Sequence, residues 1–308
     1  MTDVQTVAGT SLDQAKLALL LALADDELVI GHRHSHWTGV APQIEEDLAF
    51  SSIAQDEIGH AVVWYTIAAD TASGSGRAEG ASLDALGLGR PMEGYRNAIL
   101  VERENRDWAF TIARQYLYDT ADDVRLEALA GSSWRAVADA TGALRREERY
   151  HLLHAHAWVD RLADGPVEAR RKLGDGLVAA FGEALGLFEP LPGEEELVAE
   201  GILPAPHAEL LQRWLDLVAA DLSRVGLERV LEEGAVAGEG EMVATSSGEM
   251  APAEVILAGP HVTRRGDQWV PVGEFRGRGG RHGIHSEDFP AVWEEMTGTY
   301  RAHPGARW

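Results

Sequence analysis

The sequence predicts an all-α protein whose core is a bundle of four long helices. Two segments repeat one step, a Glu followed three residues later by a His: Glu57-Ile58-Gly59-His60 and Glu148-Arg149-Tyr150-His151. Residues three apart lie on one face of an α-helix, so each step places a carboxylate beside an imidazole. A further carboxylate precedes each step, because Glu27 lies 30 residues before Glu57 and Asp119 lies 29 residues before Glu148. Two adjacent antiparallel helices return the chain to the same height over such a span.

Two helix pairs that each give one carboxylate and one Glu-x-x-His form the di-iron carboxylate site of a ferritin-like bundle. We therefore predict a ferritin-like four-helix bundle with additional C-terminal helices and an irregular, partly β insertion. The predicted organisation is a tail at 1–10, a helical domain at 11–232, a Gly-rich insertion at 233–284, and a C-terminal helix and tail at 285–308.

Composition narrows the class of protein. With 308 residues the chain can bury a sizeable core, and with no cysteine it cannot hold disulfides, Cys-ligated zinc or iron–sulfur clusters. The N-terminus lacks a signal-peptide pattern and the apolar run at 17–24 is too short to span a membrane, so we expect a soluble, cytoplasmic protein. The net charge of −23 argues against nucleic-acid binding. It also repels an anionic substrate such as a coenzyme A ester unless local arginines counter it.

The first two helices are predicted at 11–37, with Ser11 as N-cap, and at 42–71. Glu27 lies in an otherwise apolar stripe, where a carboxylate is paired or bound to metal because burying it alone is costly. The alternative is that Glu27 lies at the edge of the stripe in water, beside Asp25 and Asp26. The two inner faces carry Leu20, Leu23, Glu27, Ile30 and His34, and then Phe50, Ile53, Glu57, His60 and Trp64.

The third and fourth helices are predicted at 107–129 and 133–162. Asp122 and Asp123 compete with Asp119 for the ligand role, and Asp119 is preferred because its offset from Glu148 mirrors the first pair. Glu147 is one residue off the inner face, and no Lys or Arg occupies a matching inner position. The inner faces carry Ile112, Tyr116, Asp119, Asp123 and Leu126, and then Leu144, Glu148, His151, Ala155 and Trp158.

The remaining segments are less regular. We expect an irregular connection at 81–92, a short solvent-facing helix at 93–105, and helices at 167–188, 205–232 and 286–300. The insertion contains β-like pieces at 254–257 and 268–272. Three arginines among its glycines contact phosphates or an acidic partner, or else remain in solvent: Arg276, Arg278 and Arg281.

The predicted ligand set suits two iron ions, or manganese ions. Glu57 and Glu148 bridge the metals, Glu27 and Asp119 are terminal, and His60 and His151 serve one metal each. Such a site leaves open positions for O₂ and supports oxygen insertion into a C–H bond or an aromatic ring. Four further residues are candidates for the walls and surroundings of the site: Tyr116, Trp64, Trp158 and Asp123.

Several stretches resemble the phenylacetate-degradation proteins of the 1,2-phenylacetyl-CoA epoxidase, a multicomponent di-iron monooxygenase, and above all its PaaC-type structural subunit. They are Trp37-Thr38-Gly39-Val40-Ala41-Pro42 with Glu45-Glu46-Asp47-Leu48-Ala49, Ile112-Ala113-Arg114-Gln115-Tyr116, Glu148-Arg149-Tyr150-His151-Leu152, Gly283-Ile284-His285-Ser286-Glu287 and Pro304-Gly305-Ala306-Arg307-Trp308. The resemblance implies homologous ferritin-like partner subunits, a separate reductase and an aromatic CoA-thioester substrate. The structural subunit of this family typically has a degraded metal site, whereas all six ligand positions are intact here, as in its catalytic sister.

Three functions remain open from the sequence. The first is an oxygenase component that activates O₂ at the metal pair. The second is a scaffolding subunit that docks a catalytic homologue and keeps a vestigial or inactive site. The third is iron storage or oxidation as in ferritins, which no cage-forming feature supports.

Overall fold

The computed structural model describes residues 11–74, 82–232, 242–244, 250–252, 261–273, 276–304 and 306. This part of the chain is predominantly helical, as the sequence predicts. None of its helices is long and apolar enough to cross a membrane. The predicted tail at 1–10 and the predicted β-like piece at 254–257 lie outside the described residues.

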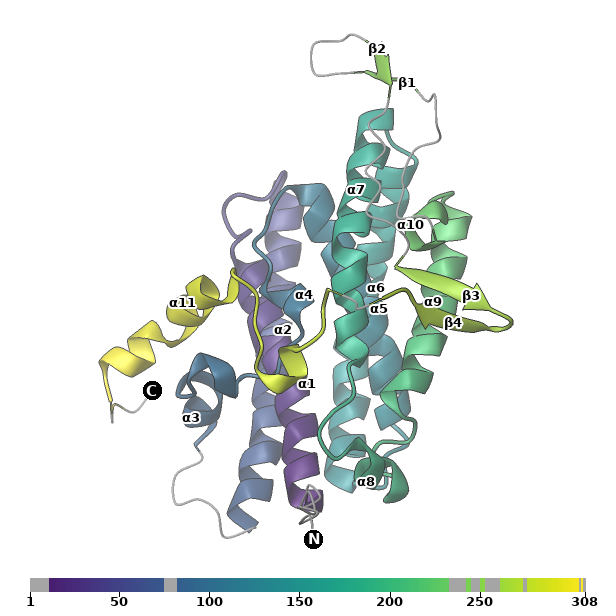
Figure 1. Cartoon of the computed structure of the whole chain (residues 1–308). Helices are drawn as coiled ribbons and strands as arrows, with labels where there is room; N and C mark the ends of the chain where they lie inside the picture. Colours follow the sequence, from purple (N-terminus) through teal and green to yellow (C-terminus); the bar gives the residue numbers. More distant parts are fainter. Residues whose placement is uncertain are drawn as a thin grey trace, which may run out of the picture.

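Four long helices run side by side and form the core: α1 (Leu12–Ser35), α2 (Ile44–Gly74), α5 (Trp108–Leu129) and α6 (Arg135–Ala163) (Figure 1). Helix α1 packs along α2, and α5 packs along α6. The predicted ranges differ from these bounds by at most three residues. Helix α1 begins where expected, because the Ser11 side chain accepts from Gln14 N at 3.4 Å and the Gln14 side chain accepts from Ser11 N at 3.0 Å.

A second layer covers the outer side of α5. Helix α7 (Val167–Ala184) and α9 (His207–Arg224) both pack on α5, so α5 is buried on almost every side. The predicted helix at 167–188 ends earlier as α7 and continues as the 3₁₀ turn η2 (Leu185–Phe188). The predicted helix at 205–232 is two helices, α9 and α10 (Arg229–Glu232), because Gly226 turns the chain with φ of 68°. Helix α8 (Glu194–Ala199) was not predicted.

The connection between the two helix pairs also differs from expectation. Residues 81–92, expected to be irregular, contain α3 (Leu83–Leu88) and the start of η1 (Met92–Gly94). The helix expected at 93–105 is reduced to α4 (Ile99–Glu102), whose four residues are all buried instead of facing solvent. Glu102 anchors this segment through contacts with Asn97, His285 and Ser286.

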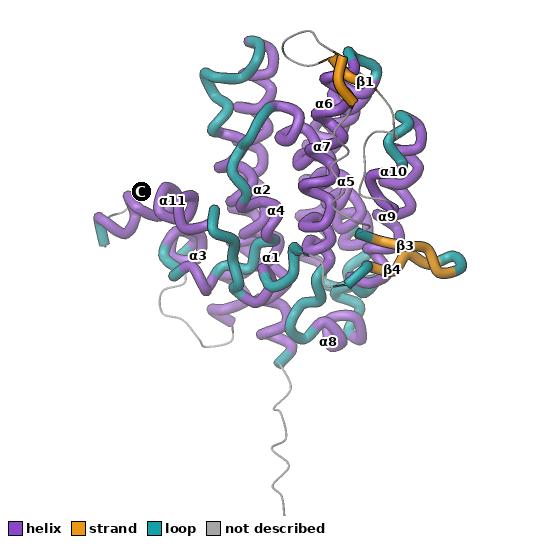
Figure 2. The backbone as a smooth tube through the Cα atoms, turned by 45° about the horizontal axis from the view of Figure 1, so that its top comes forward, coloured by secondary structure: helices purple, strands orange, loops and turns teal. Residues whose placement is uncertain are grey.

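Two short antiparallel strand pairs lie beside the helices (Figure 2). Strands β1 (Met242–Ala244) and β2 (Met250–Pro252) form one, and β3 (Val262–Arg265) and β4 (Gln268–Pro271) form the other. Gly266, with φ of 64°, begins the two-residue turn of the second hairpin. The predicted β-like piece at 268–272 is therefore confirmed as β4.

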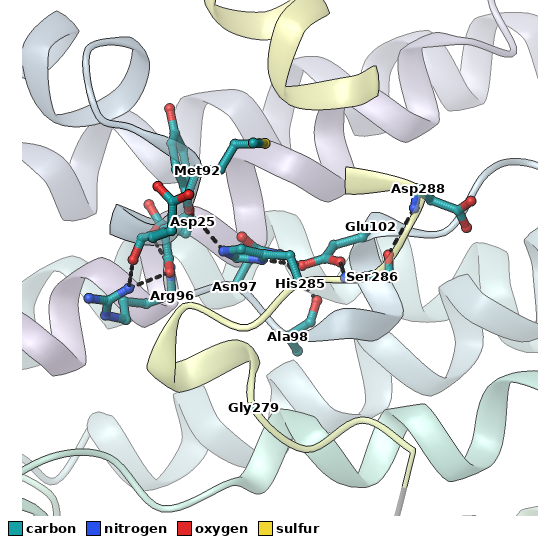
Figure 3. Close-up of polar contacts among 12 residues, drawn as sticks. Asp25, Met92, Arg96, Asn97, Ala98, Glu102, Gly279, His285, Ser286 and Asp288 are labelled. Atoms are coloured by element: carbon teal, nitrogen blue, oxygen red, sulfur yellow. Dashed lines mark hydrogen bonds and ion pairs between the residues drawn. The ribbon is translucent and has the colours of Figure 1, made fainter. Parts of the chain in front are cut away.

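The segment 276–288, which we call the C-terminal arm, returns from the second hairpin to the core. It contains the 3₁₀ turn η3 (Gly280–His282) and leads into α11 (Phe289–Ala302), where the sequence predicted a helix at 286–300. Figure 3 shows the arm fastened to Glu102, which accepts from Asn97 Nδ2 at 2.9 Å and Ser286 N at 2.6 Å. His285 Nδ1 lies 2.5 Å from the same carboxylate. These contacts explain why Glu102 is buried.

Arg281 differs from its predicted place in solvent or on a phosphate, because it is only 1% exposed. Its guanidinium donates to both oxygens of Asp26 at 2.7 and 2.8 Å and to the carbonyl of Leu187 at 3.1 Å. Arg125 Nη1 donates to the same Asp26 carboxylate at 2.7 Å. A buried carboxylate with two guanidiniums is compensated, so Arg281 ties the arm to α1.

The arm crosses the end of α7 at two glycines. A Cβ on Gly277 would lie 2.2 Å from the Glu183 carbonyl oxygen, and a Cβ on Gly186 would lie 2.2 Å from the Gly277 carbonyl oxygen. Real Cβ contacts do not reach such distances, so the two backbones can approach only because both positions lack a side chain.

We expect Gly277→Ala to lower the free energy of unfolding by about 1–3 kcal/mol, as overpacking in a rigid contact does. The matched control is Gly142→Ala in the exposed part of α6, where nothing lies within 4 Å of the added Cβ. That change should stabilise by about 0.5–1 kcal/mol through helix propensity. Urea unfolding of the two variants measures both effects, and a Gly277→Ala protein as stable as the wild type would contradict the crossing.

Candidate metal centre

Helix α1 buries three consecutive acidic residues, and only two of them are paired with an arginine. Asp25 accepts from Arg90 Nη1 at 3.0 Å, and Asp26 binds Arg281. Glu27 is 2% exposed and no Lys or Arg of the described chain lies within ion-pair distance of it. The alternative in which Glu27 lies in water beside Asp25 and Asp26 is therefore wrong, since all three carboxylates are buried.

Glu27 joins a compact cluster between α1, α2 and α6. One ligand atom from each of Glu27, Glu57, His60 and Glu148 lies within 4.8 Å of the others. His60 Nδ1 is 3.1 Å from Glu148 Oε1 and 3.7 Å from Glu27 Oε2. His151 Nδ1 is 3.3 Å from Glu148 Oε1 and 3.7 Å from Glu57 Oε1. Both Glu-x-x-His steps thus meet at one place, with the Nδ1 atoms turned toward the carboxylates.

Asp119 on α5 is not among the four residues whose ligand atoms lie within 4.8 Å of one another, but His151 and Glu148 are among its electrostatic neighbours. Asp119 is fully buried and neither of its carboxylate oxygens has a hydrogen-bond partner. Its competitor Asp122 is also buried, but one oxygen of Asp122 accepts from Arg125 Nη2 at 2.8 Å. Asp123 lies near the surface, 3.9 Å from Arg145. Asp119 is therefore the best placed of the three candidates to bind a metal. Arg125 is buried in the interior, where the sequence suggested no basic residue.

The candidate ligands fit divalent metal ions because many of their buried oxygen and nitrogen atoms have no hydrogen-bond partner. Buried polar groups almost always have partners, so a concentration of groups without them needs an explanation such as an ion. Carboxylate and imidazole atoms are the ligands expected for iron or manganese in such a bundle. The buried atoms without a hydrogen-bond partner include Glu27 Oε2, both carboxylate oxygens of Glu57, Asp119 and Glu148, and Nδ1 of His60 and His151.

Without a metal, protons compensate these charges. Burial and the neighbouring Glu27 raise the pKa of Glu57 well above its usual value, and burial does the same to the pKa of Asp119. Burial opposes charging of His60, but its contacts with Glu148 and Glu27 raise its pKa to about 12. Metal ligands must be deprotonated, so metal ions and protons compete for the same atoms.

The outer nitrogens of the two histidines are held crosswise between α2 and α6. His60 Nε2 lies 2.8 Å from Glu147 Oε2, and His151 Nε2 lies 3.4 Å from Asp56 Oδ2. Each acid directly precedes the Glu of the opposite Glu-x-x-His step. A carboxylate that accepts the Nε2 proton leaves the Nδ1 lone pair free for a metal and orients the ring.

Two buried residues beside the cluster were missed as site candidates. His34 is fully buried, neither ring nitrogen has a hydrogen-bond partner, and its Nδ1 lies 4.0 Å from Glu57 Oε1. Its position seven residues after Glu27, on the same predicted stripe, was the available signal. Tyr118 is fully buried with an unpartnered hydroxyl, and burial together with Glu27 and Glu57 raises its pKa well above the usual value.

The residues predicted to form the walls of the site have different surroundings in the structure. Trp64 is fully buried one turn after His60, as a wall residue requires. Trp158 donates from Nε1 to Glu46 Oε2 at 2.8 Å and packs edge-on against Trp108. Tyr116 differs from expectation, because its hydroxyl donates to Asp221 on α9 at 3.1 Å and so points away from the cluster.

The three arginines predicted to contact phosphates or an acidic partner also differ in exposure. Arg281 is buried on Asp26, whereas Arg276 and Arg278 are exposed. Arg276 lines a cleft with residues of α5 and α7.

Known proteins match most of the chain. A family described as phenylacetic acid catabolic protein matches residues 1–241. A relative from Escherichia coli (strain K12), named as the 1,2-phenylacetyl-CoA epoxidase subunit designated C, is 27% identical over 291 residues. The matched region covers 94% of this chain and 98% of the relative.

We expect His60→Ala or His151→Ala to lower iron occupancy markedly, because each removes an Nδ1 ligand that the cluster cannot replace. His154→Ala is the matched control, since His154 lies on α6 but its nitrogens contact Glu46 at 2.8 Å and Gln115 at 3.3 Å. Elemental analysis after anaerobic iron loading measures occupancy. Equal loss in all three variants would show that general destabilisation, not ligation, is responsible.

The crosswise contacts generate a second expectation. Glu147→Gln and Asp56→Asn should each weaken metal affinity by about 10- to 100-fold, as loss of a histidine's outer partner does in metal sites. Asp139→Asn, an exposed acid of the same helix α6 that pairs with Arg135 at 3.2 Å, is the control. Competition with a metal indicator measures affinity, and unchanged affinity in both site variants would contradict a supporting role.

Proposed function

The chain belongs to the family of phenylacetic acid catabolic proteins, and we propose that it is the oxygen-activating subunit of a multicomponent di-iron monooxygenase of phenylacetate catabolism. Its substrate would be an aromatic CoA thioester, and the reaction ring epoxidation. The relative named as a subunit of 1,2-phenylacetyl-CoA epoxidase supports this reaction class. Homologous subunits and a reductase that delivers electrons complete the proposed assembly.

One observation carries the proposal, the intact set of buried ligands. A subunit that only scaffolds its partners has no need to bury four carboxylates beside histidines, because buried charges without good partners are strongly unfavourable. Apolar or ion-paired residues would pack these positions at lower cost. The four carboxylates and two histidines are instead buried together, with most of their ligand atoms free of other partners.

In this proposal each residue has a defined task. The carboxylates of Glu27, Glu57, Asp119 and Glu148 and the imidazoles of His60 and His151 would hold the two iron ions. When bound and reduced, the iron pair supplies activation of O₂ for transfer of one oxygen atom to the ring.

The surrounding residues prepare the ligands and exclude water. Glu147 and Asp56 hold the Nε2 protons of His60 and His151, so that Nδ1 faces the carboxylates. Trp64, whose ring is fully buried one turn after His60, would keep bulk water from the cluster and so strengthen the electrostatic interactions inside it.

Scaffolding remains the second candidate, and one specific observation favours it. The relative that the chain matches over 94% of its length is the epoxidase subunit designated C, and the motifs outside the ligand set resemble the structural subunit. In that case the same bundle would dock a catalytic homologue, and the ligand set of this chain would be vestigial, or filled with metal but inactive. The acidic surface, with a net charge of −23, would favour a more basic partner.

We expect His151→Ala in this chain, reconstituted with its partner subunits and reductase, to abolish product formation while the complex still assembles. His154→Ala should leave turnover near the wild-type rate. Oxygen consumption coupled to epoxide formation measures activity, and size-exclusion chromatography measures assembly. Full activity of a complex that carries His151→Ala would assign the chemistry to another subunit and support scaffolding.

A further inference from the structure

A cleft of about 720 Å³ opens where the C-terminal arm passes the start of α5 and the middle of α7. Such a volume lies within the range of about 300–1,000 Å³ that is typical of small-molecule sites. Its floor includes the ring of Phe110 and the side chains of Val178 and Ala179, and its polar rim comes from three segments distant in sequence. The charged lining residues are Arg106, Asp107, Arg171, Lys172, Asp175 and Arg276.

Two of the four basic residues are already paired. Lys172 Nζ lies 3.5 Å from Asp107, and Arg171 pairs with Asp175 at 2.5 Å and with Glu168 at 2.9 Å. These contacts use the acidic side chains of the rim. Asp107 and Asp175, the two acidic residues of the rim, are therefore each already paired with a basic residue.

The other two basic residues are Arg106 and Arg276. Within the described chain no carboxylate lies within ion-pair distance of either, and both are exposed. The Arg106 guanidinium lies 4.6 Å from the centre of the Phe110 ring, a cation–π contact with a residue that lines the cleft. In a chain with 50 acidic and 27 basic residues, two unpaired arginines at one cleft are unusual.

A third guanidinium adds positive charge behind Arg106. Arg114 is fully buried and donates only to neutral acceptors, the Arg103 carbonyl and the Asn105 side chain. Its Nε has no hydrogen-bond partner. Burial and the nearby charges of Arg33 and Arg106 lower the pKa of Arg114 to about 9. Arg114 therefore adds a buried positive charge near Arg106 that has no ion-pair partner among the described residues.

One acceptor in the cleft also lacks a donor. Asp175 Oδ1 is buried without a hydrogen-bond partner, while its other oxygen is held by Arg171. A ligand that carries an anionic group beside a hydroxyl would satisfy Arg106, Arg276 and Asp175 together. Arginine pairs bind phosphate oxygens with charge-assisted hydrogen bonds, and a sugar phosphate offers the hydroxyl.

We propose that this cleft binds the phosphate group of a phosphorylated small molecule through Arg106 and Arg276, with a neighbouring hydroxyl on Asp175. The bound phosphate group would belong either to the nucleotide end of a CoA thioester or to free phosphate. The first source rests on the proposed function, and it would explain how a chain of net charge −23 accepts an anionic substrate.

The experiment is calorimetric titration of the full chain, without added iron, with CoA, with 3′-dephosphorylated CoA and with inorganic phosphate at fixed ionic strength. Arg276→Ala and Arg106→Ala should each weaken binding about 10- to 100-fold, as loss of a charge-assisted hydrogen bond does. Arg276→Lys keeps the positive charge but loses the planar guanidinium. Its affinity for the ligand should lie between those of the wild type and Arg276→Ala. The control Arg135→Ala removes the same charge from a side chain that is 91% exposed on α6 and should not change binding.

Preferential binding of CoA supports the nucleotide source, and equal binding of inorganic phosphate supports free phosphate as the ligand. Binding that is absent, or that is unchanged in both Arg106→Ala and Arg276→Ala, overturns the site. Circular dichroism confirms that each variant is folded. The titration uses neither iron nor turnover. A negative result would therefore not contradict the metal centre, and a protein that binds no iron could still be tested for phosphate binding.

Discussion

Buried carboxylates set the physical problem that this bundle must solve. Asp25, Asp26 and Glu27 follow one another on α1, and all three are removed from water. Arginines compensate the first two, whereas Glu27 faces Glu57 and Glu148 with only histidines nearby. Like charges at such distances repel strongly in an interior of low dielectric constant, so protons or metal ions must enter the cluster. A metal that binds only the folded state would then stabilise the fold by mass action.

The compensated carboxylates explain how distant segments position the site. Asp26 binds Arg281 of the C-terminal arm, and it is the residue next to Glu27. The arm is held in turn by the glycine crossing at Gly186 and Gly277 and by the anchor at Glu102. A segment more than 250 residues away along the chain thereby fixes the part of α1 that presents Glu27. What the sequence suggested was a separate insertion is, at its C-terminal end, a part of the core.

The long helices and the six candidate ligands follow from the sequence because local rules govern them. Capping by Ser11 and the spacing of Glu-x-x-His require no knowledge of the tertiary packing. Helix α5 shows where such rules fail. It is buried on almost every side, so its polarity does not reveal which face meets the site. Tyr116 was therefore chosen as a wall residue although it faces α9, and Tyr118 was missed.

The burial of Arg281 and the pairing of Arg90 with Asp25 could not be predicted for a related reason. Each depends on contacts between segments that are far apart in sequence, and a charged residue among glycines or beside a turn normally lies in solvent. The unpaired state of Arg106 and Arg276 is likewise visible only when every carboxylate near the cleft has been assigned to another partner.

The most direct test of the metal centre is the iron content of the wild-type protein after anaerobic loading with ferrous iron and removal of excess metal. We expect about two iron ions per chain, with Mössbauer parameters of a carboxylate-bridged pair. A stoichiometry near zero in a protein with native helix content would contradict the metal centre. The buried carboxylates would then be compensated by protons alone.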